Sequence, residues 1–389
     1  MYRYADIRKV HLEITSKCNA SCPQCSRNFF GKPFPSFPLT ELTLEDIRTI
    51  FPEDFVRQLT LMFMSGTYGD AVVARHTLET FEYFRACQPS MRLGMHTNGS
   101  GRNPEWWQRL AGVVDYCAFG IDGLADTNYL YRRGTKWEKV IESARAFIGA
   151  GGHAEWHFIV FRHNEHQVEQ ARTLARELGF KEFCVKRTGR FLKGWKQTPF
   201  SPVLDREGRL EYLLEMPESP QYRNQNFLEV YHNRDAGEAH LRETPIDCKV
   251  AGSRSVYVSA EGLVLPCCWM ATLYPDRESV EADEVQRLVE VLPLQKAKPV
   301  GRLRSQGLQE VWQLIERLPQ GKDSINARLV PLKDIVEGPF FQELVPGGWE
   351  RKPFAEGRLR VCAKHCGECN VKAAQNVTMA LRPSIFQPR

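Results

Sequence analysis

The sequence of 389 residues contains no apolar run that approaches the length of a membrane span, which needs about 20 consecutive apolar residues. The N-terminal segment has no apolar h-region of the kind that export signals carry. Twelve cysteines without an export signal indicate a reducing cytoplasm, where cysteines more often bind metals than form disulfides. The net charge of +5 is mild and requires no nucleic acid. We therefore expect a cytoplasmic protein with neither a membrane nor a nucleic-acid partner.

A fourth cysteine is missing from the first cysteine group. Cys18, Cys22 and Cys25 directly follow an alternating run at residues 10–14, and the next cysteine is Cys87. Four cysteines close a [4Fe–4S] cluster, whereas three leave one iron open to a small molecule. The alternative is a structural zinc site with His11 as the fourth ligand. The spacing favours an iron–sulfur centre with an open iron.

Strand and helix patterns alternate from residue 10 to residue 187. Helical stripes of apolar residues, as at 137–148 and 168–178, separate short runs typical of buried strands. The predicted strands are residues 10–14, 59–64, 91–95, 115–121, 155–161 and 182–186. Such alternation predicts an α/β fold with a parallel sheet and right-handed crossovers. Residues that follow the strands are then expected to meet at one edge of the sheet.

Polar and glycine-rich turns follow the second, third and fourth predicted strands. They read Ser-Gly-Thr-Tyr-Gly-Asp at 65–70, Thr-Asn-Gly at 97–99 and Phe-Gly-Ile-Asp-Gly at 119–123, and an arginine-bearing turn follows at 131–134. Together with the cysteine spacing, these turns resemble the radical S-adenosylmethionine (SAM) superfamily. The sequence departs from the family pattern at Gly120, where serine is frequent, and at Gln24, where many relatives carry an aromatic residue.

The resemblance implies a partial (β/α)6 TIM-like barrel in which the open iron of a [4Fe–4S] cluster binds SAM. The implied cluster ligands are Cys18, Cys22 and Cys25. The implied SAM-binding residues are Gly66, Tyr68, Gly69, Asp70, Thr97, Asn98, Asp122 and Arg133. His157 and His163, on and after the fifth strand, are candidates for acid or base chemistry near the substrate.

A second cysteine group lies in the C-terminal third of the chain. Its members are Cys248, Cys267, Cys268, Cys362, Cys366 and Cys369. A hairpin turning at residues 260–262 would present two thiolates, and a later C-x2-C pair could complete a four-thiolate site. This arrangement resembles the SPASM/twitch extension of radical SAM enzymes, in its twitch form with one auxiliary [4Fe–4S] cluster. The implied ligands are Cys248, Cys267, Cys366 and Cys369; Cys362 or Cys268 could replace one of them, and a zinc site fits the same pattern.

These patterns divide the chain into three parts. Residues 1–190 are expected to form the core barrel, 191–245 a linker with short helices, and 246–389 the auxiliary cluster domain with an insert at 269–361. The basic and aromatic residues at 187–196 are interpreted as part of a solvated linker.

The expected activity is hydrogen abstraction from a substrate by the radical that SAM yields, with flavodoxin or ferredoxin as a typical reductant. SPASM/twitch enzymes often crosslink, oxidise or epimerise peptide or protein side chains, which is the first hypothesis. The alternative is dehydrogenation or epimerisation of a small polar molecule such as an aminocyclitol or sugar. No leader-binding domain is recognisable before residue 10, which weakens the peptide hypothesis. A non-catalytic zinc-binding protein is the remaining class.

Overall fold

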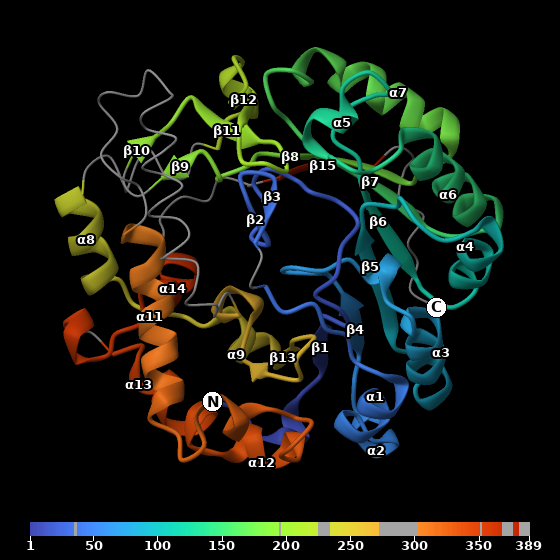
Figure 1. The fold of residues 1–389 in the computed structure, drawn as a ribbon. Helices are drawn as coiled ribbons and strands as arrows, with labels where there is room; N and C mark the ends of the chain where they lie inside the picture. Colours follow the sequence, from blue (N-terminus) through green and yellow to red (C-terminus); the bar gives the residue numbers. More distant parts are fainter. Residues whose placement is uncertain are drawn as a thin grey trace.

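A nine-stranded sheet organises the computed structural model, which describes residues 1–34, 37–193, 196–224, 234–271, 302–350, 352–367 and 376–380. The strand order is β14-β13-β1-β4-β5-β6-β7-β8-β15. The strands are β1 (Lys9–Leu12), β4 (Leu61–Met64), β5 (Arg92–Thr97), β6 (Tyr116–Gly120), β7 (Ala154–Ile159), β8 (Glu182–Lys186), β13 (Ser255–Val258), β14 (Val264–Leu265) and β15 (Asn376–Ala380). The outermost strands β14 and β15 do not pair with each other, so the sheet is curved but open (Figure 1).

The predicted alternation of strands and helices is confirmed. Strands β1, β4, β5, β6, β7 and β8 are parallel neighbours in chain order. Helices α3 (Thr77–Cys87), α4 (Pro104–Ala111), α6 (Trp137–Gly149) and α7 (Val168–Leu178) lie along the outside of this arc (Figure 1). The parallel arrangement places all loops that follow these strands at one edge of the sheet.

The local sequence explains where several helices begin and end. Thr43 and Asp46 form a reciprocal capping box at the start of α1 (Leu44–Ile50). Asn103 caps α4, whose first residue is proline. Helix α7 ends at Gly179, whose φ of 90° is a left-handed conformation that glycine adopts without steric cost.

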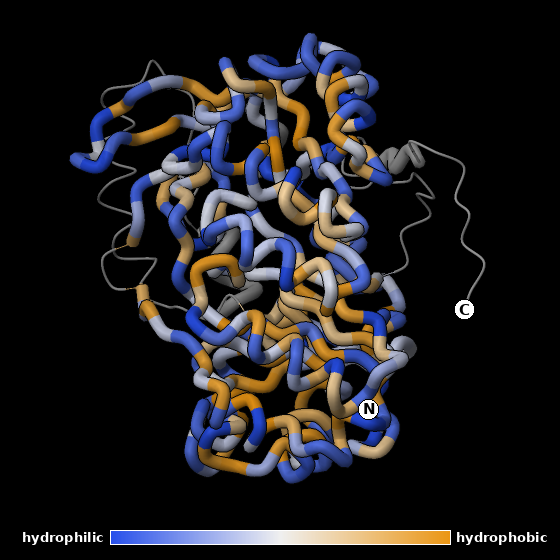
Figure 2. Tube along the Cα trace, turned by 90° about the vertical axis from the view of Figure 1, so that its right-hand side faces the viewer, coloured by the Kyte–Doolittle hydropathy of each residue, from blue (hydrophilic) through white to orange (hydrophobic). Residues whose placement is uncertain are grey.

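The core lies between the convex face of the sheet and these helices. Side chains on β6 and β7 alternate, so that Phe119, Trp156 and Phe158 are fully buried against the helices. Trp107 of α4 and Phe147 of α6 pack around Phe119. Burying a large apolar side chain contributes about 1.5–3 kcal/mol to stability. Figure 2 shows the hydrophobic segments along the chain.

The second cysteine group is built on the same sheet. The hairpin predicted around residues 260–262 is confirmed, because β13 and β14 are antiparallel and Gly262 has a φ of 90° at the turn. Strand β13 also pairs with β1 in parallel register. The hairpin that precedes Cys267 therefore extends the central sheet on the β1 side.

Residues 200–215 differ from the expected linker. They form an antiparallel hairpin of β11 (Phe200–Leu204) and β12 (Leu210–Glu215), with Gly208 in a left-handed conformation at the turn. Proline and charges in this segment hide the strand pattern, although Val203, Leu204 and Leu214 are buried. Short two-stranded ladders are also formed by β2 (Asn28–Phe29) with β3 (Lys32–Pro33) and by β9 (Leu192–Lys193) with β10 (Lys196–Gln197).

Helices of the C-terminal half lie across from the outer helices of the barrel (Figure 1). They are α8 (Arg234–Glu243), α9 (Lys249–Ser253), α11 (Arg302–Glu316), α12 (Leu332–Glu337), α13 (Val345–Gly347) and α14 (Arg360–Cys366). Of the predicted insert at 269–361, residues 272–301 and 351 lie outside the described residues. No helix in the described ranges combines the length and the apolar character needed to cross a bilayer.

Candidate active site

The first three cysteines lie in the loop that follows β1, at the carboxyl end of the parallel strands. They pack into one small apolar cluster that also contains Tyr131 and Phe161. Burial raises the pKa of Cys22 to about 11 and also raises the pKa of Cys18. Free thiolates are thus disfavoured here unless positive charge accompanies them, as a bound metal centre would provide.

A buried ion pair reaches this loop from β6. Arg132 Nε lies 2.6 Å from Asp122 Oδ2, and Arg132 Nη1 lies 4.0 Å from Cys22 Sγ. Asp122 is fully buried and also accepts a hydrogen bond of 2.5 Å from the Ile159 backbone N–H. Burial raises the pKa of Asp122, and the charge of Arg132 opposes this rise. The pair places a guanidinium beside the cysteines.

Gly120 makes room for this guanidinium. A Cβ atom at position 120 would lie 2.3 Å from Arg132 Nη2, closer than any real contact. In this structure the Arg132 guanidinium therefore occupies the space that a side chain at position 120 would take.

Arg133, the arginine singled out in the sequence, has different partners. Its Nη1 donates a hydrogen bond of 2.6 Å to the Leu204 carbonyl, and its Nη2 pairs with Glu211 of the β11–β12 hairpin. The structure thus brings the Arg132 guanidinium to Cys22, whereas the Arg133 guanidinium binds the hairpin and only the Arg133 backbone carbonyl contacts the cysteine loop, at Ser21 N–H.

The ends of β4 and β5 meet at the same loop. The Asp70 carboxylate accepts hydrogen bonds from Thr97 Oγ1 at 2.8 Å and from the Asn98 backbone N–H at 2.7 Å. Asn98 Nδ2 donates to Asn19 Oδ1 at 2.9 Å and lies 3.7 Å from Cys18 Sγ. Asp70, Thr97 and Asn98 are therefore brought together, and Asn98 is the member that contacts the cysteine loop.

Glu13 binds the glycine-rich turn through hydrogen bonds, and it is not among the site residues predicted from the sequence. Its Oε1 accepts hydrogen bonds from the backbone N–H groups of Tyr68 at 2.6 Å and Gly69 at 2.8 Å, and Tyr257 donates its hydroxyl to Oε2. A Cβ atom on Gly69 would lie 1.7 Å from the Thr15 carbonyl oxygen, so only glycine permits this approach. An acid in the run 10–14, whose other members apart from His11 are apolar, was the available signal.

Glu13 is expected to give the fold a pH dependence that Glu13→Gln removes. Burial raises its pKa from 4.5 to about 7, so the folded chain favours the protonated carboxyl. Its contribution to stability is fully present below pH 4.5 and is lost as the pH rises through about 7. Relative to the Gln variant, the wild type should lose about 3 kcal/mol of unfolding free energy over this range. Urea denaturation of both proteins at several pH values measures the difference; parallel pH profiles would contradict the assignment.

Unpartnered polar atoms gather in the turn between the cysteines and β2. Four of the ten buried side-chain atoms without a partner in the described residues belong to this turn: both amide atoms of Gln24, Arg27 Nε and Asn28 Oδ1. An unpaired buried polar group costs about 1–3 kcal/mol. The turn therefore fits a polar ligand held beside the cysteines, as SAM bound to a cluster would be.

Four cysteines of the second group surround one pocket. Cys248, Cys267, Cys362 and Cys366 line it together with Trp349. A hydrogen bond from Cys248 lowers the pKa of Cys366, as expected for thiols in direct contact. Cys362, which the sequence offered only as a possible replacement ligand, lines this pocket; Cys369 lies outside the described residues, and Cys268 does not line the pocket.

The histidines considered in the sequence have other partners. The His11 ring is buried on β1, where Nε2 lies 2.5 Å from the Ser65 carbonyl oxygen and the ring stacks on Phe63. His157 pairs with Glu155 at 3.0 Å on the inner face of β7, and His163 stacks on Phe161. The His11 ring therefore contacts residues at the end of β4, which does not support His11 as a zinc ligand.

Comparisons with known proteins give one family match and several distant structural similarities. A family model described as the radical SAM superfamily matches residues 12–178, and no curated protein matches the chain. Solved structures are similar at low identity. SuiB of Streptococcus suis bound to S-adenosylmethionine is 12% identical with a TM-score of 0.43, over 68% of this chain and 61% of that one. The anSMEcpe structure with AdoMet and the Cp18Cys peptide is 14% identical with a TM-score of 0.47, over 92% and 88%.

BtrN in complex with AdoMet and 2-DOIA is 12% identical with a TM-score of 0.40, over 95% of both chains. This chain thus spans about three fifths of the SuiB chain. The family match rests on the same segment that carries the cysteine loop and the strand ends described above. Residues 12–178 are therefore similar to the radical SAM superfamily.

Proposed function

We propose that Cys18, Cys22 and Cys25 hold a [4Fe–4S] cluster that binds SAM, and that the enzyme abstracts a hydrogen atom from its substrate. The observation that carries this proposal is the convergence of Asn98 and Arg132 on the sulfur atoms of Cys18 and Cys22, beside a turn with unpaired polar atoms. When bound and reduced, the cluster and SAM supply a 5′-deoxyadenosyl radical, while the protein supplies orientation.

The proposed SAM-binding residues fall into two roles. Gly66, Tyr68 and Gly69 present backbone groups whose position Glu13 fixes, and Thr97, Asn98 and Asp122 lie at the next strand ends. Asp70 acts as a positioning residue, because its carboxylate is bonded to Thr97 and Asn98. We assign the cationic role to Arg132 in place of Arg133, since the Arg132 guanidinium lies beside Cys22 whereas the Arg133 guanidinium binds the Leu204 carbonyl.

The release of 5′-deoxyadenosine from SAM by anaerobically purified protein and dithionite tests this function. The proposal predicts dithionite-dependent release. Protein that contains a full complement of iron and releases none would overturn it. Zinc in place of iron would favour the non-catalytic metal-binding class.

We further propose an auxiliary [4Fe–4S] cluster in the pocket of the second cysteine group. Support comes from the four thiols that line it, since four thiolates close such a cluster. Cys362 is the proposed fourth ligand, with Cys248, Cys267 and Cys366. A four-cysteine zinc site is the competing occupant of the same thiols.

Cys362→Ala should lower the iron content by about four atoms per chain, because an auxiliary cluster that loses one of four ligands is destabilised. Cys268→Ala is the matched control, since Cys268 is adjacent to Cys267 but does not line the pocket. Iron and acid-labile sulfide are measured in both variants. Retention of all iron in Cys362→Ala would instead favour Cys369 as the ligand.

For the substrate, we propose a peptide or protein side chain, which the SPASM/twitch-like cysteine pattern supports. The second candidate is a small polar molecule, which the polar character of the inner face favours. Barrel interiors are usually filled by branched apolar residues. Here the inner face of β5, β7 and β8 carries His96, Glu155, His157 and Lys186. Peptide and small-molecule fractions of a cell extract, added separately, should differ in how strongly they stimulate 5′-deoxyadenosine release. Stimulation by the small-molecule fraction alone would remove the peptide hypothesis.

A further inference from the structure

Two carboxylates face each other directly across neighbouring strands. Glu155 of β7 and Glu182 of β8 are register partners, so both side chains project from the same face of the sheet. Like charges in directly opposite positions destabilise a sheet, typically by a few tenths to about 1 kcal/mol. Neither residue is fully exposed to water, and Glu155 retains only 14% of its side-chain surface. A positive charge between the two carboxylates would relieve this repulsion.

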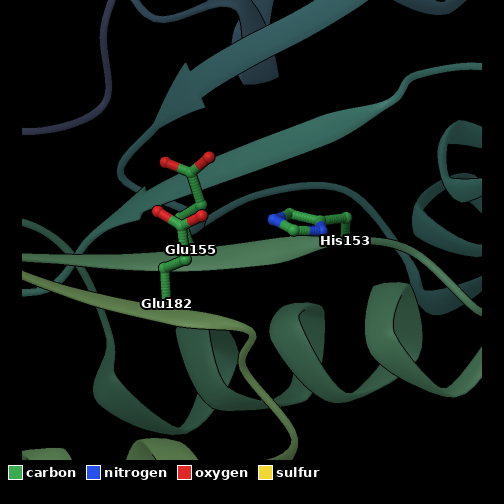
Figure 3. A group of neighbouring side chains, drawn as sticks. All are labelled: His153, Glu155 and Glu182. Carbon is green, nitrogen blue, oxygen red and sulfur yellow. The ribbon is translucent and has the colours of Figure 1, made fainter. Parts of the chain in front are cut away.

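A histidine completes the group. His153 precedes β7, and one ligand atom from each of His153, Glu155 and Glu182 lies within 4.8 Å of the others. Figure 3 shows the imidazole and the two carboxylates directed into one common space. An imidazole nitrogen and two carboxylate oxygens at this spacing can all bind a single ion.

Two neighbouring side chains are placed to assist a metal bound by these groups. His157 Nε2 lies 3.0 Å from Glu155 Oε2, the type of outer hydrogen bond that orients a ligating carboxylate. His96 packs against His157, and burial lowers the pKa of His96 to about 4, so His96 is neutral at pH 7. Lys186 is a cationic side chain on the same face of β8, four residues beyond Glu182.

We propose that His153, Glu155 and Glu182 bind a divalent first-row transition-metal ion, with His157 as an outer partner of Glu155. Mixed imidazole and carboxylate ligands suit Mn2+, Fe2+ and Zn2+, whereas thiolates select softer ions. The site lies at the amino-terminal ends of β7 and β8, and the cysteine loop lies at the opposite edge of the sheet. The ion would join the two strands and the turn before β7, which is a structural role that is independent of SAM.

Titration of the purified, cluster-loaded protein with Mn2+ tests the site, with the six-line EPR signal of free Mn2+ as the readout. We expect one saturable Mn2+ per chain. Glu182→Gln and His153→Gln should each weaken binding more than 10-fold, and His157→Gln about 10-fold. Glu53→Gln is the matched control, because Glu53 is an exposed acid on α2 (Glu53–Arg57) that pairs with Arg57.

Two results would overturn the proposal. One is the absence of saturable binding up to millimolar Mn2+, which would assign the compensating charge to protonated imidazole. The other is equal affinity in the wild type and in both ligand variants, which would place the ion elsewhere. The two ligand variants lie on different elements, and their circular dichroism and iron content show whether each has folded. Binding of Mn2+ is scored separately from SAM cleavage, so failure of this site leaves the proposed function untouched.

Discussion

Changing Cys18, Cys22 and Cys25 together to Ala should abolish reductive cleavage of SAM and lower bound iron from about eight to about four atoms per chain. The three cysteines lie together in one group of apolar side chains after β1. Their removal should therefore delete one iron–sulfur cluster and spare the pocket lined by Cys248 and its neighbours. Iron, acid-labile sulfide, zinc and 5′-deoxyadenosine are measured in the same anaerobic preparations.

The control for the cysteine variant is Cys87→Ala. Cys87 is a half-buried residue at the end of α3, outside both cysteine groups, and its removal should leave iron and activity unchanged. Two results would contradict the assignment. Iron that stays at the wild-type level in the triple variant is one, and undiminished SAM cleavage is the other.

Arg132→Leu should damage both the fold and the activity, whereas Arg133→Leu should damage neither severely. Loss of Arg132 leaves the fully buried Asp122 carboxylate without its partner, which costs about 3–5 kcal/mol for a buried pair. Arg133 pairs with Glu211, whose side chain is about half exposed (46%), and a solvent-exposed pair contributes about 0–1 kcal/mol. Urea denaturation and the rate of 5′-deoxyadenosine release measure the two effects.

A double variant separates the structural role of Arg132 from its role toward SAM. In Arg132→Leu with Asp122→Asn, no buried charge remains unpaired, so most of the lost stability should return. If Arg132 also acts on bound SAM, the activity should stay below that of the single variant Asp122→Asn despite this recovery. Full recovery of activity would show that Arg132 acts only as the ion-pair partner of Asp122. A larger loss of activity in Arg133→Leu than in Arg132→Leu would instead favour Arg133 as the SAM-binding arginine, as predicted from the sequence.

Much of the central sheet could be predicted because its signals are local. The period of apolar residues gives each strand and helix, and chain order then gives the parallel neighbours, as the pairing of β4 through β8 confirms. The pairing of β13 with β1 could not be predicted, because it joins residues about 245 positions apart and no local pattern encodes it.

The choice between Arg132 and Arg133 was also beyond the sequence. Both arginines follow the same strand, and what distinguishes them is the space above Gly120 that receives one guanidinium. Glu13 was missed for a similar reason: its three hydrogen-bond partners come from β13 and from the turn after β4. Site residues that act through tertiary contacts need the fold before they can be identified.

The central claim is that the three-cysteine loop holds a cluster with an iron that is open to SAM. The EPR spectrum of the dithionite-reduced protein, recorded with and without SAM, tests it most directly. The test uses the Cys362→Ala variant, in which the auxiliary signal should be absent. We predict that SAM shifts the g-values of the remaining signal, because the ligand field of one iron changes. A cluster signal that SAM leaves unchanged at saturating concentration would contradict the claim.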